Sequence, residues 1–358
     1  MIKPSLGIAA ALALAVAGLS AGSASAATQP TPQTKMAWQA AIAQVPQPGQ
    51  GCYQASYPTL AWHAVTCVAA PNVPFIPAPP SSSARHAGPD TVGDTHDYSA
   101  QVPGLISRAT GTFTHVSPGI TVDGAVLGSP TMVANGFSLQ LNSQNITGSP
   151  ACSGSSDPSG CIAWQQFLYA YDAGSALNGG NPSSSYIFMQ YWLISYGYTC
   201  PIGWASDGEG DCYVNSKAAV VNAVTASELA TLRFSGTAKS GGNDGVSLSI
   251  GSGQATMVTA SDSRIDLAKH WNTTEWGLFG DGDGDEAYFG TNMSLEPQTA
   301  LTASSGSKAP KCISAGTTGE TNNLELTTTP KLGSQSSPTM ATRQTDGTSG
   351  TPSCAVAG

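Results

Sequence analysis

Two kinds of side chain in this sequence could together hydrolyse an acyl bond: a glutamate in one strand-like run and two glutamines in another. Glu275 lies in the run 274–279, and Gln165 and Gln166 are adjacent in the run 162–171. A glutamate on a strand can take a proton from water at acid pH and return it to a leaving amine. A neighbouring amide can donate a hydrogen bond to the oxyanion that forms on a carbonyl. Side chains of these types could therefore carry out hydrolysis at acid pH if the fold brings them together.

Strand alternation decides which glutamine can share a site with Glu275. Gln166 lies on one face of its run with Trp164, whereas Gln165 lies on the opposite face with Phe167. Only one of the two glutamines can line a groove.

The elements that must position these residues are short strands. Gly 41 and Pro 24 occur in 358 residues, and alternating apolar runs are separated by Gly, Ser, Asn and Pro clusters. We predict an all-β protein, an antiparallel two-sheet β-sandwich of the jelly-roll, concanavalin-like kind, with a small N-terminal prosegment. About ten to twelve strands are expected, the clearest over residues 105–116, 137–142, 162–171, 186–196, 229–238, 246–250, 274–279, 286–295 and 324–328.

An acidic loop follows the Glu275 run and reads Asp-Gly-Asp-Gly-Asp-Glu from Asp281 to Glu286. Asp-Gly pairs make tight turns, so residues 275–290 are expected to form a β-hairpin. Glu stands where an EF-hand needs Gly, which leaves either plain turns or a looser structural Ca²⁺ site at Asp281, Asp283 and Asp285. Otherwise no cofactor and no metal are expected.

The first 26 residues read as a signal peptide. Lys3 precedes an apolar run that ends in Ala24-Ser-Ala26, the small-residue pattern before a cleavage site. The protein is therefore expected to be secreted. A Pro/Ser-rich linker at 77–85 marks a further boundary, and the predicted divisions are a signal peptide 1–26, a prosegment with linker 27–92, a β-sandwich domain 93–330 and a Ser/Thr/Gly-rich tail 331–358. A stapled extension of the main domain is the alternative to a prosegment.

Eight cysteines in an exported chain indicate four disulfides. They fall as couples along the chain, and we predict Cys52 with Cys67, Cys152 with Cys161, Cys200 with Cys212, and Cys312 with Cys354. The first three couples are each separated by a short turn-rich loop, where closure costs least entropy. The five histidines lack zinc-site spacing, and neither a G-x-S-x-G elbow nor a Walker loop occurs.

The charge balance limits the partners. Asp plus Glu total 22 against 13 for Lys plus Arg, a net charge of −9, so the chain lacks the basic surface that binds nucleic acid or anionic lipid. We expect no nucleic acid partner, no membrane partner, protein or peptide substrates, and a monomer.

Three stretches resemble the eqolisins, a family of secreted glutamic peptidases. Residues 97–102 and 109–116, which include Thr-Gly-Thr-Phe, resemble the opening strands of their mature domain. Residues 274–279, with Tyr288-Phe-Gly290, resemble their Glu-Trp strand and the Phe-Gly that follows it. Residues 162–167 and 186–193 fall where those enzymes carry a Gln strand and a Trp-bearing strand, so the resemblance covers roughly residues 93–300.

The resemblance implies a two-sheet sandwich, a prosegment, and a catalytic Glu and Gln on one sheet. Glu275 corresponds to the catalytic Glu. The family's Gln-Thr-Gly is absent, and Gln166 is favoured over Gln165 because Trp164 on its face resembles the Trp-lined groove of eqolisins. Gln190 and Trp192 share a face of the next run and, with Trp164, are the expected substrate contacts.

Other interpretations of these residues stay open. Glu275 could be a rim carboxylate, Gln190 a satisfied amide, and the tryptophans sandwich core. A glycosidase needs two carboxylates about 5 to 9.5 Å apart. In the expected hairpin Glu275 and Glu286 are separated by four residues of strand, or about 13 Å, which is too far apart for such a pair. A non-catalytic, lectin-like sandwich that stacks sugars on exposed aromatic residues is the alternative from another class.

Overall fold

The computed structural model describes residues 34–78, 91–126, 129–171, 184–303, 309–347 and 353–354. The predicted signal peptide and most of the predicted linker lie outside the described residues. The described residues belong to one compact unit, Pro32–Gly358. It is built of antiparallel sheets in a sandwich-like arrangement, which confirms the all-β fold class.

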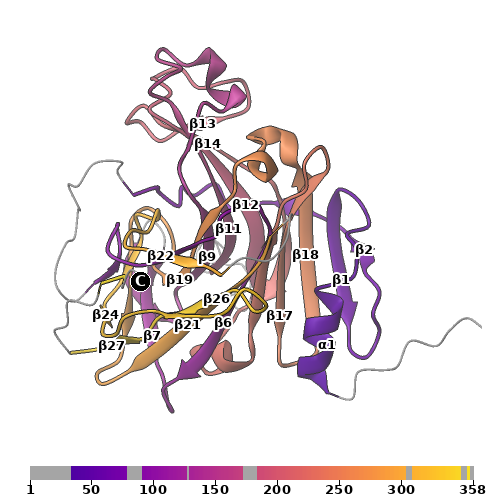
Figure 1. The fold of residues 1–358 in the computed structure, drawn as a ribbon, viewed down its shortest axis with the longest axis vertical. Coiled ribbons are helices and arrows are strands. Elements are labelled where there is room, and N and C mark those ends of the chain that lie inside the picture. Colours follow the sequence, from indigo (N-terminus) through magenta and orange to yellow (C-terminus); the bar gives the residue numbers. More distant parts are fainter. Residues whose placement is uncertain are drawn as a thin grey trace, which may run out of the picture. The chain divides into compact units, whose positions relative to one another are not determined.

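Sheet 1 contains eleven strands in the described part of the chain. One edge is made by the N-terminal strands and the other by strands from the end of the chain (Figure 1). The tail predicted from residue 331 therefore contributes strands to this sheet. Its order is β2 (His63–Val65), β1 (Gly51–Ser56), β18 (Gln254–Ser261), β17 (Asn243–Ile250), β16 (Arg233–Thr237), β6 (Ile106–Val116), β21 (Ser294–Ala303), β26 (Thr339–Ala341) and β25 (Lys331–Leu332), with β27 (Gln344–Thr345) paired to β21 and β24 (Glu325–Leu326) paired to β27.

Sheet 2 carries the candidate residues and also contains eleven strands among the described residues. Its central strands β12, β11, β9 and β19 are neighbours and carry the predicted Gln and Glu runs (Figure 1). The order is β13 (Ala205–Ser206), β14 (Cys212–Asn215), β12 (Ser184–Ile194), β11 (Ile162–Tyr171), β9 (Ser138–Ser143), β19 (Thr273–Phe279), β5 (Ser99–Gln101) and β22 (Lys311–Ile313), with β10 (Ile146–Thr147) on β11, β15 (Lys217–Asn222) on β12, and β3 (Val68–Ala69) on β15.

Sheet 3 corrects the predicted hairpin. The strand after the acidic loop, β20, pairs with β7 and β23 and not with β19, so the expected pairing of residues 275–279 with 286–290 is wrong. Glu286 aligns with Thr321 instead of Phe279. The loop turns the chain from one sheet into another, which the Asp-Gly turn signal alone could not distinguish from a hairpin. The order is β4 (Val92–Gly93), β23 (Thr321–Asn322), β20 (Glu286–Phe289), β7 (Val122–Val126) and β8 (Ser129–Ala134).

Helices are few and short. Helix α1 (Lys35–Ile42) begins at Thr34, whose side chain accepts a hydrogen bond from the Ala37 amide. The expected strand over residues 229–238 starts only at Arg233, because the residues before it form a 3₁₀ turn. The 3₁₀ elements are η1 (Pro150–Gly154), η2 (Ala226–Thr231), η3 (Asp262–Arg264) and η4 (Leu267–Lys269). No helix of the described residues is both long and apolar enough to cross a membrane.

The core lies between sheets 1 and 2 and follows from strand alternation. Leu141, Phe167, Tyr191 and Trp276 point from sheet 2 into this core. The Trp276 ring stacks on Phe234 of sheet 1 with centroids 5.5 Å apart. The residues that alternate with these core residues must point to the opposite face of sheet 2.

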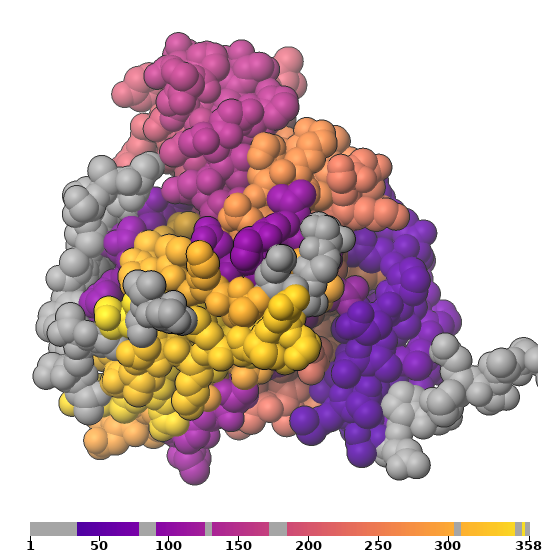
Figure 2. Space-filling view, viewed as in Figure 1, coloured from indigo at the N-terminus to yellow at the C-terminus, as the bar shows by residue number. Residues whose placement is uncertain are grey.

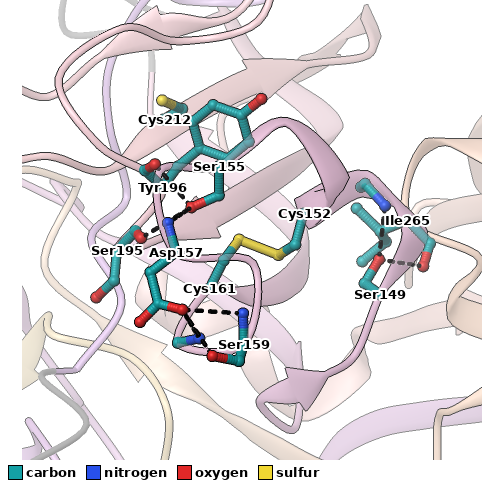
Figure 3. Close-up of a disulfide and its surroundings, with 12 residues drawn as sticks. Ser149, Cys152, Ser155, Asp157, Ser159, Cys161, Ser195, Tyr196, Cys212 and Ile265 are labelled. Atoms are coloured by element: carbon teal, nitrogen blue, oxygen red, sulfur yellow. Dashed lines mark hydrogen bonds between the residues drawn. A yellow bond between two sulfur atoms is a disulfide. The ribbon is translucent and has the colours of Figure 1, made fainter.

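All four predicted disulfides are present, Cys52–Cys67, Cys152–Cys161, Cys200–Cys212 and Cys312–Cys354. The Cys152–Cys161 bond closes a loop in which Asp157 accepts hydrogen bonds from Ser159 (Figure 3). Four disulfides fit an oxidising compartment.

The N-terminal residues are part of the folded unit. Strand β1 pairs along its whole length with β18, and the indigo N-terminal atoms lie directly against the rest of the protein (Figure 2). Residues 71–78 follow β3, which pairs with β15 of sheet 2, and contact the outer face of sheet 2.

Candidate active site

A row of polar side chains crosses the outer face of sheet 2. Glu275 on β19 aligns with Asn142 on β9, Asn142 aligns with Gln166 on β11, and Gln166 aligns with Gln190 on β12. The row ends at Asn215 on β14. The first four residues are at most 1% exposed. At about 4.8 Å between strands, Glu275 and Gln166 stand about 10 Å apart along the row, with Asn142 between them.

Residues 71–78, which we call the strap, lie against this row in extended form. Gln190 Nε2 donates to the Val73 carbonyl at 2.8 Å, and the Phe75 amide donates back to Gln190 Oε1 at 2.8 Å. Gln166 Nε2 donates to the Phe75 carbonyl at 2.5 Å. Asn215 Nδ2 donates to the Pro71 carbonyl at 2.8 Å. The amide row thus recognises the backbone of the strap.

The other edge of the strap is bound by a loop, residues 315–320, which precedes β23. The Ile76 amide donates to Glu320 Oε1 at 2.7 Å, and the Gly319 amide donates to the Ile76 carbonyl at 2.8 Å. The Ala78 amide donates to the Thr317 carbonyl at 2.8 Å. The backbone of the strap is therefore held on both sides, as an added strand would be.

The side chains of the strap fill apolar sites on sheet 2. Phe75 is 1% exposed and packs with Leu168, Ala170, Phe188 and Ala218. Its ring centroid lies 6.1 Å from that of Phe188, in an edge-on arrangement. The next strap residue, Ile76, packs against Trp164 and Trp192.

Trp164 and Trp192 lie on the same outer face as Gln166 and are completely buried. They form an apolar cluster with Tyr213, against which Ile76 of the strap packs. The Trp192 ring stacks on Tyr213 at 5.2 Å. Trp192 Nε1 donates to Gln190 Oε1 at 2.8 Å, and so orients the amide that binds the strap.

Gln165 points the opposite way. Its Nε2 lies 3.8 Å from Met189 Sδ in the interior. Burial and Asp262 raise the pKa of Asp244 well above its usual range, and the Gln165 amide opposes this rise. Gln166, and not Gln165, therefore shares a face with Glu275.

Glu275 is sealed beneath the 315–320 loop. Its Oε2 accepts hydrogen bonds from Asn142 Nδ2 at 3.1 Å and from the Thr317 and Thr318 amides at 2.8 and 3.1 Å. Its Oε1 faces Asp97: an added Cβ on Gly316 would lie 2.3 Å from Glu275 Oε1 and 1.8 Å from Asp97 Oδ1. The loop can approach this closely because residue 316 is glycine.

The Asp97 and Glu275 carboxyls form a buried acidic pair. Burial raises the pKa of Asp97 well above its usual range, and the charge of Glu275 and a hydrogen bond with it raise the pKa further. Asp97 therefore retains its proton at pH values where a free aspartate has lost its own. Asp97 belongs to the stretch that resembles eqolisins, but its chemistry was not predicted from the sequence.

Glu320 is a second carboxyl that sequence reasoning missed. It is 0% exposed, and its Oε2 accepts from Gln140 Nε2 at 3.1 Å and from Thr318 Oγ1 at 2.5 Å. Burial raises the pKa of Glu320 to about 7, against the opposing effect of these hydrogen bonds. The one signal in the sequence is an isolated acidic residue in an otherwise uncharged Gly/Thr-rich loop, beyond the stretch that resembles eqolisins.

The acidic loop, for which plain turns and a Ca²⁺ site were the alternatives, makes contacts within the protein. Asp281 Oδ1 accepts from the Tyr171 amide, and the Asp283 amide donates to the Pro74 carbonyl of the strap. Across the described ranges, no three His, Cys, Asp or Glu side chains are grouped so that they could hold a metal ion. The loop helps to hold the strap.

No protein-family model, no curated protein and no solved structure matches this chain.

Proposed function

We propose that this chain is a secreted acid endopeptidase, made as a zymogen whose prosegment spans residues 27–92. The observation that supports this is the strap. An extended segment of the chain lies across an amide row, with its backbone bonded on both edges and Gln166 Nε2 on the Phe75 carbonyl oxygen. Substrate peptides bind to peptidase grooves through the same kind of backbone contacts.

In this proposal Gln166 is the oxyanion donor. A donor that already bonds the carbonyl oxygen needs little rearrangement when that oxygen becomes negatively charged, which is the condition for electrostatic stabilisation. Gln190 positions the substrate backbone, and Trp164 and Trp192 support the groove.

Glu275 is the general base and acid of the proposal. Its carboxyl lies in the same row as Gln166, next to Asp97, and that pair can hold and release a proton. In the strap-bound form the Thr317 and Thr318 amides cover Glu275. Loss of the strap removes the Ala78 bond to Thr317, and so frees the outer edge of that covering loop.

The test is hydrolysis of an unfolded protein substrate by the exported protein from about pH 2 to 7, with and without chelator. Activity should be acidic, because a carboxyl base works best near its own pKa, and chelator should not change it. Glu275→Gln should abolish turnover, and Gln166→Ala should lower the rate on the order of 10²- to 10³-fold. Glu296→Gln is the matched control, because that glutamate lies in sheet 1 and pairs with Lys331.

The same variants distinguish a sugar-binding sandwich from a peptidase. A lectin should keep its binding when Glu275 becomes Gln, whereas a peptidase should lose turnover. Full activity of Glu275→Gln at every pH would contradict the proposed role of Glu275. The burial of both tryptophans under the strap leaves neither ring open for sugar stacking in this form.

A further inference from the structure

The Phe75–Ile76 peptide bond of the strap is held by one side chain at each of its polar atoms. Its carbonyl oxygen accepts from Gln166 Nε2 at 2.5 Å, and its N–H donates to Glu320 Oε1 at 2.7 Å. If the strap lies as a substrate does, these atoms stand for the carbonyl and the leaving nitrogen of a substrate bond. The carboxyl that contacts the leaving nitrogen is then Glu320.

We propose that Glu320 is a further catalytic residue, the acid that protonates the leaving amine of the bond bound by Gln166. This inference rests on the proposed peptidase function and refines it: Glu275 keeps the role of general base, and Glu320 takes over from Glu275 the role of acid. It assigns the cleaved bond to the position after the residue that occupies the Phe75 site. The substrates are accordingly extended chains with a large apolar residue at that position.

The bonds around Glu320 allow it to hold or lose a proton without leaving a buried polar atom unpaired. Thr318 Oγ1 lies 2.5 Å from Glu320 Oε2 and 2.7 Å from Gln140 Oε1. A hydroxyl has one hydrogen and can also accept. When Glu320 is ionised, Thr318 donates to it. When Glu320 is protonated at Oε2, Glu320 donates to Thr318, which then donates to Gln140.

The same network joins the two carboxyls of the groove. Asn142 Nδ2 donates to Glu275 Oε2 at 3.1 Å and to Gln140 Oε1 at 3.2 Å. Gln140 in turn contacts Glu320 directly and through Thr318. Networks of this kind fix the positions of their side chains, so removal of one carboxyl also changes the hydrogen bonds that hold the other.

The proposed step balances with water as the only co-reactant. Ionised Glu275 takes a proton, directly or through a second water that spans the Asn142 position, from the water whose oxygen bonds to the carbonyl carbon. The resulting oxyanion is stabilised by Gln166. Protonated Glu320 then gives its proton to the amide nitrogen as the carbon–nitrogen bond breaks, and for this step the proton must lie on Oε1, the oxygen that faces the nitrogen, while Thr318 donates to Oε2. The products are a carboxylic acid end and an amine. Transfer of a proton from Glu275 to Glu320, through solvent, restores both groups.

The experiment compares two substrates with the same acyl part, a peptide amide and an activated ester whose leaving group needs no proton. Glu320→Gln should lower kcat/KM for the amide on the order of 10²- to 10⁴-fold. The ester should lose less than tenfold. Glu296→Gln, the control in sheet 1, should leave both rates unchanged. A purely structural role for Glu320 would lower both rates alike.

The outcomes distinguish failure of the Glu320 role from failure of the proposed peptidase function. An active wild type with an undiminished amide rate in Glu320→Gln, or with equal losses on both substrates, overturns the role of Glu320 alone. Absence of acid hydrolysis by the wild type overturns the proposed function and this inference with it. If Glu320→Gln shows no cooperative thermal unfolding, and so does not fold, the same comparison is made with Thr318→Val. That variant removes the hydroxyl beside Glu320 Oε2, and it must also slow the amide more than the ester.

Discussion

Replacement of Glu320 by Gln should change how the stability of the full chain depends on pH. The pKa of Glu320 is about 7 in the folded protein against 4.5 for an ordinary glutamate. The folded form therefore binds more protons than the unfolded form between these values, and this carboxyl makes the protein less stable as pH rises from 4.5 to 7. The pKa difference corresponds to about 3 kcal/mol. Glutamine does not titrate, so the variant should lack this decline.

The measurement is the free energy of unfolding by denaturant for wild type and Glu320→Gln between pH 4 and 8, with disulfides intact. The free energy of unfolding of the variant minus that of the wild type should increase by about 3 kcal/mol as the pH rises from 4 to 8. Using the difference removes contributions from other groups, such as Asp97, that both proteins share. Glu296→Gln should shift in the opposite direction, because Thr114 and Lys331 lower the pKa of Glu296. A wild-type-to-variant difference that stays constant from pH 4 to 8 would refute the assignment of a raised pKa.

Three further results are expected. Phe75→Ala leaves a cavity beneath the strap, which should lower the stability of the closed strap by about 3 kcal/mol. A broad-specificity protease at pH 7 should then cut within residues 71–78 on the order of 10²-fold faster. An unchanged rate would show that this side chain does not hold the strap. Gln165→Ala should lower the melting temperature and leave activity unchanged, whereas Gln166→Ala should lower activity; loss of activity in Gln165→Ala alone would place the wrong glutamine in the groove. N-terminal sequencing after acid incubation should show loss of residues 27 to about 92, and a chain that still begins near Ala27 would contradict the zymogen proposal.

Alternation explains why the sheet and the faces of its residues were predictable. Residues 162–171 form β11 with the predicted bounds, and the two-residue period alone separates Gln166 from Gln165. Three of the disulfides were predictable for a similar reason, since Cys52–Cys67, Cys152–Cys161 and Cys200–Cys212 each close a short loop. In both cases the information is local to a few residues. Cys312–Cys354 spans 42 residues and was predicted as the couple that remained.

The parts that were missed depend on contacts between distant segments. Glu320 reaches the groove only because β23 pairs in parallel with β20 and alongside β4, and no local pattern encodes that pairing. The strap lies in the groove through bonds between residues more than a hundred positions apart, such as Val73 and Gln190. The failed hairpin has the same origin, because the Asp-Gly turns allow either a hairpin or a passage between sheets.

The strap and the proton on Glu320 are linked, and this linkage constrains how a zymogen of this kind could be activated. The Ile76 backbone covers Glu320, and burial is the main cause of its raised pKa. A form with the strap displaced exposes Glu320 to water, which brings its pKa back towards 4.5. Closing the strap then takes up a proton, so through this group acid favours the closed form. Acidification therefore does not release the strap by charging the groove. If the chain is the zymogen proposed above, activation would require cleavage of the strap or linker, which removes the segment irreversibly. Through Glu320, the same proton uptake would make the emptied groove bind substrate backbones better at low pH.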